Sequence, residues 1–445
     1  MKKFLSLLVI LTMACRGQAQ VKIGVARECI TPDRPVWLSG YAARKKLSEG
    51  KLQDLWVKAL VIEGKKNSRL IMITTDIIGL TKEISEDVTG SIIDKYGLER
   101  SQIFINSSHT HSAPVIWPGL SLMYSLSDSN IIALTEYGNK LRTSTKKAVD
   151  SAMANLAEGA ISYGEGSAGF AINRRQRAGD AVKIGVNKEG PVDHSVPVLK
   201  FTSKNGNIVA VLFGYACHNT TLSGYDISGD YAGYAQDEIE RMIPGAIAMF
   251  IEGCGADQNP EPRNTVEMAA KHGNELAAAV MKTLEGSLLP LKMPVRTVYS
   301  NITLEFNDFD PVRFYKELQD PDQYRRKRAE FLLEAYDRGY ELDKLNYPVQ
   351  CIRFGKDFVL IALSGEVVVD YSINLKNLYP GKNLFVAGYS SFVPCYIPSV
   401  RILREGGYEA DNSMIYYGLP GPFKENVEEK IINTVRKNLK KISVN

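Results

Sequence analysis

The sequence predicts a large mixed α/β (α+β) domain in which buried β-sheets are flanked by helices. Helical and strand patterns alternate along the whole chain, and several strands are continuous apolar runs, as is typical of strands covered on both faces. No repeat, low-complexity tract or linker divides the 445 residues, although this length alone would allow two or three domains.

Each predicted element of the first half rests on a local pattern. A helix ends at Gly97, because glycine readily adopts the left-handed conformation that closes a helix. The elements expected here are strands at 55–62, 69–75 and 103–106, and helices at 81–96 and 132–157.

The second half begins with a hairpin signal. Asn205-Gly206 separates two apolar runs, and this dipeptide favours a tight turn between antiparallel strands. The elements expected here are strands at 196–201, 208–216, 246–252 and 359–363, and helices near 231–243, 264–285, 312–337, 366–377 and 424–440.

The composition narrows the class of partner. The chain has 54 Lys and Arg against 50 Asp and Glu, a net charge of +4, and its hydrophobic content is 44%. A nucleic-acid-binding protein would cluster its cations, and a disordered chain would be less apolar. We therefore expect a small-molecule or lipid substrate and no nucleic acid; the sequence indicates no oligomeric state.

The N-terminus resembles a secretory signal peptide over residues 1–19. Lys2 and Lys3 precede an apolar stretch at 4–14, and small residues lie near Ala19. This predicts one catalytic domain over 20–445 that is secreted or periplasmic. A lipoprotein anchor through Cys15 is the less favoured alternative, and no later apolar run is long enough to span a membrane.

The remaining cysteines do not suggest a disulfide scaffold. They are five in number, widely spaced and without a CxxC pair, so we expect buried thiols with at most one or two bridges and no structural zinc knot: Cys29, Cys217, Cys254, Cys351 and Cys395.

Two further patterns are expected to be structural. The GxGxxG match at 164–169 is not followed by a helix, which a dinucleotide site requires, because 170–180 is basic and irregular. His272 lies beside Lys271 in a helical pattern and is expected at the surface, and His194 is expected to be structural.

His109 and His111 form the most informative motif. They follow the strand predicted at 103–106, and residues i and i+2 of an extended chain point to the same side. Imidazole is a favoured ligand of zinc and related metals. The second histidine could complete the metal shell, or it could carry a proton beside it.

A second strand end adds to this interpretation. His218 follows the apolar strand predicted at 208–216, and only five histidines occur in the chain. A catalytic metal site needs about three protein ligands and one open position. Glu366, which follows Gly365 after an apolar strand, is the best candidate for a carboxylate ligand.

An ordered series of motifs along almost the whole chain resembles the neutral/alkaline (non-lysosomal) ceramidase family. These are secreted zinc amidases that split ceramide into sphingosine and a fatty acid. The motifs that carry the resemblance are Ser39-Gly40-Tyr41-Ala42, Thr75-Asp76-Ile77, His109-Thr110-His111-Ser112, Ile172-Asn173-Arg174, Cys217-His218, 229–234, Ser364-Gly365-Glu366, Tyr396, Gly407-Tyr408-Glu409 and Tyr417-Gly418.

The resemblance implies a zinc site and a set of catalytic residues. The implied zinc ligands are His109, His218, Glu366 and Tyr396. The implied catalytic residues that do not bind zinc are His111, Arg174 and Tyr408. Zinc-bound water would attack the amide carbonyl, and the oxyanion would be stabilised by the metal, Arg174 and Tyr408.

The sequence also departs from the family pattern. The family's Gly-Asp-x-Ser-Pro-Asn segment corresponds here to 253–260, which contains no serine, and the glycine-rich continuation after the HxH motif is replaced by 113–118. We expect no immunoglobulin-like domain after the catalytic domain. A ceramidase-like hydrolase acting on another N-acyl compound or a glycan is therefore an alternative, as are a TIM-barrel amidohydrolase with an HxH motif and a secreted binding protein without turnover.

Overall fold

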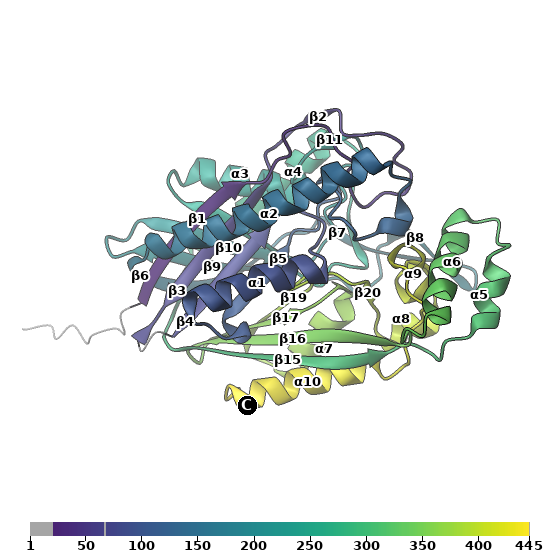
Figure 1. Ribbon diagram of the computed structural model, residues 1–445. Coiled ribbons are helices and arrows are strands. Elements are labelled where there is room, and N and C mark those ends of the chain that lie inside the picture. The colour runs from purple at the N-terminus through teal and green to yellow at the C-terminus, as the bar shows by residue number, and fades with distance from the viewer. Residues whose placement is uncertain (1–20, 66–67, 445) are drawn as a thin grey trace, which may run out of the picture.

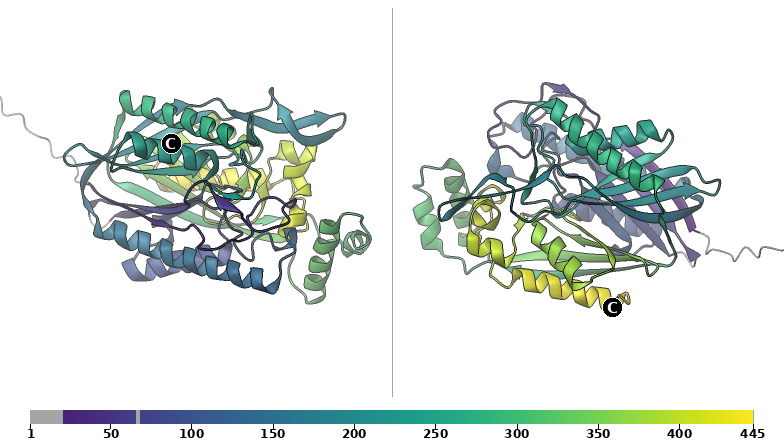
Figure 2. Two further views of the ribbon diagram at one scale, coloured as in Figure 1. Left: turned by 90° about the horizontal axis from the view of Figure 1, so that it is seen from above. Right: turned by 180° about the vertical axis from the view of Figure 1, so that it is seen from behind.

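The computed structural model describes residues 21–65 and 68–444. The predicted signal peptide and Cys15 lie outside these residues. The described chain forms four layers, with helices, a large sheet, a smaller sheet and helices stacked in that order (Figures 1 and 2). This arrangement confirms the predicted mixed α/β class.

The large sheet has nine strands in the order β12-β10-β9-β6-β1-β3-β4-β5, with β14 paired to β6. Most neighbours are antiparallel, but β10–β12 and β4–β5 are parallel. The strands are β1 (Val21–Cys29), β3 (Trp56–Glu63), β4 (Arg69–Thr75), β5 (Ile103–Ser107), β6 (Ala157–Ser167), β9 (Ser195–Ser203), β10 (Ile208–Tyr215), β12 (Ile247–Glu252) and β14 (Leu289–Leu291).

The smaller sheet has the order β15-β16-β17-β19. Its strands are β15 (Val295–Glu305), β16 (Lys344–Phe354), β17 (Phe358–Leu363) and β19 (Asn383–Ala387). Both sheets are open, with linear strand orders and antiparallel pairs, so the TIM-barrel alternative is wrong.

Shorter strands lie around the sheet ends. They are β2 (Gly50–Lys51), β7 (Ala171–Ala178), β8 (Ala181–Asn187), β11 (Asp226–Ile227), β13 (Gln258–Pro260), β18 (Glu366–Val367) and β20 (Tyr396–Ile397). β13, β7 and β8 form one small sheet, and β18 pairs with β20.

Helices cover the outer faces of both sheets. Four helices cover the large sheet: α1 (Lys82–Tyr96), α2 (Asp128–Ala154), α3 (Asp230–Met242) and α4 (Val266–Glu285). α7 (Val369–Leu378) and α10 (Val427–Lys441) cover the smaller sheet, and α5 (Pro311–Glu317) and α6 (Gln323–Asp337) project from one end (Figure 1). The remaining elements are η2 (Arg100–Gln102), η3 (Ser121–Met123), α8 (Val400–Glu405), the π-helical turn η4 (Tyr408–Asn412) and α9 (Met414–Tyr417).

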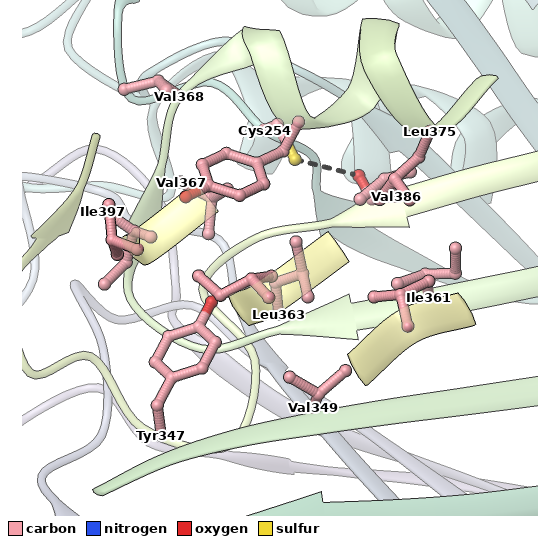
Figure 3. Close-up of a cluster of buried hydrophobic side chains, with 14 of the residues drawn as sticks. Cys254, Tyr347, Val349, Ile361, Leu363, Val367, Val368, Leu375, Val386 and Ile397 are labelled. Atoms are coloured by element: carbon pink, nitrogen blue, oxygen red, sulfur yellow. Dashed lines mark hydrogen bonds between the residues drawn. The ribbon is translucent and has the colours of Figure 1, made fainter. Parts of the chain in front are cut away.

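Alternation along the strands explains the continuous apolar runs. In β17, Phe358, Leu360 and Ala362 face the large sheet. Ile361 and Leu363 face the opposite way, into the core under α7 and α10 (Figure 3). A strand between two layers buries both faces, so it requires apolar residues at every position.

Several predicted elements were displaced or divided. The segment 312–337 forms α5 and α6 rather than one helix, and Pro321 lies in the break because proline disfavours helix at the preceding residue. The helix expected from 366 begins at Val369, since 366–367 are strand β18. The region 170–180, expected to be irregular, contains strand β7.

Two expectations about single residues also differ from the structure. His272 is buried, contrary to the prediction, because its side of α4 faces the sheet; its ring stacks on Phe170 at 4.6 Å between centroids. The five cysteines of the described chain are all free, and Cys29 alone among them is exposed. Among the described residues, no helix is both long and apolar enough to cross a membrane.

Asn106 joins the two sheets at the end of β5. Its side-chain amide donates to the carbonyl oxygen of Gly388 at 2.8 Å, and its Oδ1 accepts from the backbone N–H of Glu252 at 2.8 Å. All three residues lie where the ends of β5, β12 and β19 meet, directly before the motif that contains His109.

We expect Asn106→Ala to destabilise the fold by about 2 kcal/mol, because it leaves the buried backbone N–H of Glu252 without its acceptor. The free energy of unfolding in urea measures this effect. Asn139→Ala, on the exposed side of α2, is the control and should change stability by less than about 0.5 kcal/mol. Equal effects of the two substitutions would contradict the bridging role of Asn106.

Candidate metal centre and catalytic site

His109 reaches the site through a turn rather than an extended strand. β5 ends at Ser107, and His109 has φ 61°, in the left-handed region that non-glycine residues rarely occupy. Its backbone N–H donates to Ile77 O at 2.9 Å, and its Nδ1 donates to Ile78 O at 2.6 Å. The strained backbone and the two hydrogen bonds direct Nε2 into the site.

His111 faces the same point, as the HxH spacing predicts. Its Nε2 lies 3.2 Å from His109 Nε2, although the chain between them turns. Gly40 (φ 90°) allows this packing, since a Cβ there would lie 2.2 Å from His111 Nδ1. Burial lowers the pKa of His111 well below its usual value, and the neighbouring His109 and His218 add to this effect.

His218 is held by the main chain of the segment 253–260. Its backbone N–H donates to Gln258 O at 3.0 Å, and its Nδ1 donates to Gly255 O at 2.9 Å. This segment lacks the family's serine, but its contacts to His218 are made by carbonyl oxygens. The altered sequence therefore still holds the imidazole.

Glu366 and Tyr396 are brought together by a short parallel strand pair. β18 and β20 place them directly opposite each other, and Gly365 (φ 81°) makes the turn that leads from β17 into β18. Glu366 Oε2 lies 3.2 Å from His109 Nε2 and 3.1 Å from His218 Nε2. The Tyr396 hydroxyl lies 3.2 Å from His218 Nε2.

The tautomers explain why a cation fits between these groups. A carbonyl oxygen only accepts, so His109 and His218 both carry their proton on Nδ1 and present the lone pair of Nε2 to Glu366. Two lone pairs then face a carboxylate oxygen that has no proton to offer. A metal ion satisfies all three groups, and backbone carbonyls commonly orient metal-binding histidines in this way.

Three histidines of this centre form a group that could hold a metal ion. The nitrogen atoms of His109, His111 and His218 lie within 4.8 Å of one another, and all three side chains are buried. Burial and the charge of Arg174 lower the pKa of His218 to about 4, so a proton is a poor substitute for a metal at neutral pH.

The carboxyl of Glu366 and the phenol of Tyr396 both respond to positive charge at the centre. Burial acts to raise the pKa of Glu366, but positive charge on His109 and His218, when these rings carry it, outweighs burial and holds this pKa well below its usual value. Burial raises the pKa of Tyr396 well above 10, although Arg174 opposes the shift. Tyr396 is therefore a neutral hydroxyl unless a cation at the centre favours its ionised form.

Arg174 is placed beside Tyr396 as the motif order predicts. Its Nη2 donates to the Tyr396 hydroxyl at 3.0 Å, and its guanidinium carbon lies 5.6 Å from the ring centroid of Tyr408. Burial raises the pKa of Tyr408, so this residue keeps its proton at neutral pH. The structure thus brings all seven predicted site residues into one cluster.

Sequence reasoning missed two side chains that support this cluster. Glu409 accepts from Arg174 Nε at 2.8 Å, and the Tyr417 hydroxyl donates to Glu366 Oε1 in a short hydrogen bond. Both residues belong to motifs that carry the family resemblance, Gly407-Tyr408-Glu409 and Tyr417-Gly418, so their position in those motifs was the available signal.

A cavity of about 530 Å³ leads to the centre, where His109 and Tyr417 form part of its wall. Apolar side chains line much of it, among them Ile78, Leu80, Ile116, Phe392 and Val393. Lys82, Glu83 and Lys344 also line it. A cavity with an apolar wall and a few polar groups suits a substrate that has an apolar part and a polar part.

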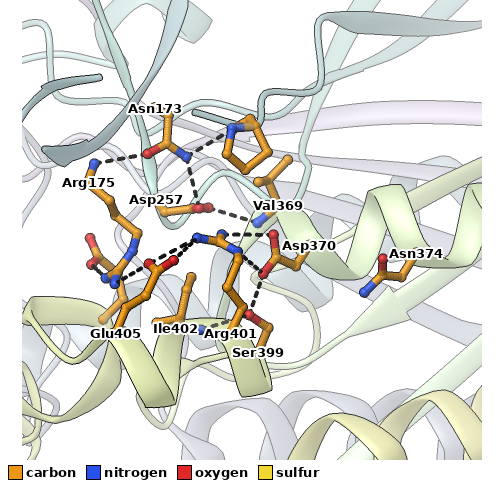
Figure 4. Close-up of polar contacts among 12 residues, drawn as sticks. Asn173, Arg175, Asp257, Val369, Asp370, Asn374, Ser399, Arg401, Ile402 and Glu405 are labelled. Carbon is orange, nitrogen blue, oxygen red and sulfur yellow. Dashed lines mark hydrogen bonds and ion pairs between the residues drawn. The ribbon is translucent and has the colours of Figure 1, made fainter. Parts of the chain in front are cut away.

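A second polar network surrounds Asp257 (Figure 4). Asp257 is fully buried; its carboxylate accepts from the backbone N–H of Val369 at 2.8 Å and from Asn173 Nδ2 at 3.2 Å. Asp257 O also accepts from the backbone N–H of Arg174 at 2.8 Å. Burial raises the pKa of Asp257 to about 7, and Asp370 and Glu409 contribute to this shift.

Comparison with known proteins identifies the family. Residues 21–288 match the sequence pattern of the family described as "Neutral/alkaline non-lysosomal ceramidase, N-terminal". The chain belongs to this family. This confirms the family expected from the ordered motifs.

The similarity to individual ceramidases is distant and partial. Neutral ceramidases of Drosophila pseudoobscura pseudoobscura and Drosophila melanogaster are each 25% identical over 251 residues, which are 54% of this chain and 34% of those proteins. The match therefore spans about a third of the length of these relatives.

Two solved structures share the fold. The neutral ceramidase of Pseudomonas aeruginosa superposes with a TM-score of 0.72 at 17% identity, covering 94% of this chain and 74% of that chain. A ceramidase complexed with C2 has a TM-score of 0.71 at 16% identity, covering 94% of this chain and 76% of that chain. The fold is neutral-ceramidase-like.

The raised pKa of Asp257 predicts a specific pH dependence. Because the folded state keeps this proton to about pH 7 and the unfolded state loses it near pH 4, Asp257 makes the fold less stable as pH rises between these values. Asp257→Asn should remove this loss of stability. Its free energy of unfolding should therefore rise by about 2 kcal/mol relative to that of wild type from pH 5 to pH 8.

Urea unfolding of both proteins at the two pH values measures the difference. Asp180→Asn, in the exposed turn between β7 and β8, is the control and should follow the wild type at both pH values. A constant difference between Asp257→Asn and wild type would show that Asp257 does not titrate in this range.

Proposed function

We propose that this protein is a zinc-dependent hydrolase that cleaves the N-acyl amide bond of ceramide or of a related acylated substrate. The observation that carries the proposal is the convergence of His109 Nε2, His218 Nε2, a Glu366 oxygen and the Tyr396 hydroxyl beside the cavity that His109 lines. Family membership supports the reaction class. The expected signal peptide, and with it secretion or a periplasmic location, belongs to this proposal.

His109, His218, Glu366 and Tyr396 would hold the zinc ion. Two imidazole nitrogens and two oxygens suit zinc, and a catalytic zinc can expand to five ligands, which would leave a position for water beside these four. When bound, zinc supplies Lewis acidity and lowers the pKa of a coordinated water towards about 7. His111, which contacts His109, is the remaining histidine of the cluster.

Three other residues of the cluster can transfer a proton and stabilise developing charge. His111 is neutral and its buried Nδ1 has no hydrogen-bond partner in the described chain, so it can accept a proton and pass it to the leaving nitrogen. Arg174 and Tyr408 are both protonated and lie on one side of Tyr396. They can donate hydrogen bonds to a carbonyl oxygen as negative charge develops on it.

The apolar wall of the cavity would bind an acyl chain. Phe331 of α6 adds an aromatic side chain from the projecting helical pair. The same cavity contains charged and amide side chains, which suits a polar head group. An N-acyl amino acid, or an acylated or simple glycan, is the second class of substrate, favoured by the altered segments 113–118 and 253–260.

The metal proposal predicts near-stoichiometric zinc in the purified protein and a loss of at least tenfold in zinc affinity for His218→Ala. Metal analysis after dialysis, followed by titration of the metal-free protein with zinc, measures both. His194→Ala is the matched control, since His194 lies outside the centre and contacts Ala171 O. Zinc-free wild-type protein that cannot be loaded would refute the proposal.

The substrate proposal predicts release of fatty acid from ceramide in detergent, measured by mass spectrometry beside N-acyl amino acids and glycans. Tyr408→Phe should retain zinc but lower kcat about 100-fold, because one oxyanion donor is lost. Tyr416→Phe, whose ring packs against Tyr324, is the control and should keep wild-type turnover. Cleavage confined to other substrates would replace ceramide and leave the metal chemistry intact.

A further inference from the structure

A second cavity lies at the other end of the smaller sheet. Its volume is about 470 Å³, and it is lined by Arg296 of β15, Arg353 of β16, Lys356 of the turn after β16, and Lys382 before β19. β16 begins at Lys344, which lines the first cavity, and ends beside Arg353, which lines the second. A strand of this length spans roughly 30 Å. The two cavities are therefore separate.

The cations of this cavity are not neutralised by the described protein. The lining contains one carboxylate, Asp357, and none of the four cations makes an ion pair in the described chain. A smaller cavity of about 320 Å³ shares Val444 with it and adds two more cations, Arg436 and Lys440, which make no ion pair with the described residues. This concentration contrasts with the near-balanced charge of the whole chain.

Arg353 is the least exposed of these side chains. It is 9% exposed, and its Nε has no hydrogen-bond partner in the described structure. Burial lowers the pKa of Arg353, and the charge of Arg296 lowers it further, so no nearby carboxylate compensates this guanidinium. A guanidinium that lines a cavity without a compensating carboxylate is stabilised when an anion in that cavity pairs with it.

The end of α10 explains only part of this arrangement. Arg353 Nη1 donates to Ser443 O, just beyond the end of the helix, and Arg296 contacts the Ser443 hydroxyl at 3.5 Å. A helix C-terminus carries about half a negative charge, which cannot offset four cations. Lys356 and Lys382 come from the strand ends, and their ammonium groups have no such partner among residues 21–65 and 68–444.

We propose that the cavity lined by Arg296, Arg353, Lys356 and Lys382 binds a phosphate-bearing anion. Arginine and lysine together are the usual recognition set for phosphate, with the planar guanidinium supplying paired donors and the ammonium groups supplying charge. The anion is a free phosphate compound or the phosphodiester of a lipid head group. The turn after β16 and the end of α10 lie at the same end of the molecule as the start of β1 (Figures 1 and 2).

The test uses the full chain in two arms at low salt. Isothermal titration with inorganic phosphate measures the free anion, and co-sedimentation with phosphatidylglycerol or phosphatidylcholine vesicles measures the lipid source. The variant Lys356→Gln/Lys382→Gln removes two exposed cations without touching the buried Arg353. The control Lys183→Gln/Lys188→Gln removes two exposed cations on and beside β8, so it changes the net charge equally.

We expect binding in at least one arm, weakened at least tenfold in Lys356→Gln/Lys382→Gln and unchanged in the control. Phosphate binding indicates a free anion, and binding only to phosphatidylglycerol vesicles indicates a lipid head group. Absence of binding in both arms overturns the proposal, and so does equal weakening in the control, which would show attraction to net charge alone. Zinc content and amide hydrolysis should not change in either variant.

Discussion

Two backbone carbonyls determine the chemistry of this site. Ile78 O and Gly255 O accept from Nδ1 of His109 and His218, which leaves each Nε2 as a lone pair directed at Glu366. Without a cation these groups repel one another, because every one of them is an acceptor. The packing of the two sheets holds these acceptors together, an arrangement that a metal ion could stabilise.

The four-layer architecture explains how residues so far apart in sequence meet. His109, His218 and Glu366 each follow the end of a buried strand, namely β5, β10 and β17. These strand ends lie at one edge of the two stacked sheets, and Asn106 fastens that edge by joining β5 to the residues that follow β19 and to β12. Catalytic side chains on the ends of rigid strands are held more accurately than side chains on free loops.

Much of the fold and the cluster could be predicted from sequence, for a physical reason. Continuous apolar runs mark strands buried on two faces, and rare histidines after such runs mark a functional edge. Tyr396 followed only from the family motifs, because chemistry alone does not suggest a phenol as a ligand. The supporting contacts of Ile78 and Gly255 are made by backbone carbonyls, which no side-chain pattern can reveal. The prediction that His272 is exposed was wrong, because its polar neighbour Lys271 does not indicate which side of α4 faces the sheet.

The division between main-chain and side-chain contacts suggests how such a site can change its substrate. The segment 253–260 holds His218 through the carbonyl oxygens of Gly255 and Gln258, so its side chains can vary while the imidazole stays in place. Tyr417 behaves differently, since its hydroxyl holds Glu366 and its side chain also lines the cavity. Whatever occupies the cavity therefore contacts a residue that orients the carboxylate, and a change of substrate through Tyr417 would alter the centre itself.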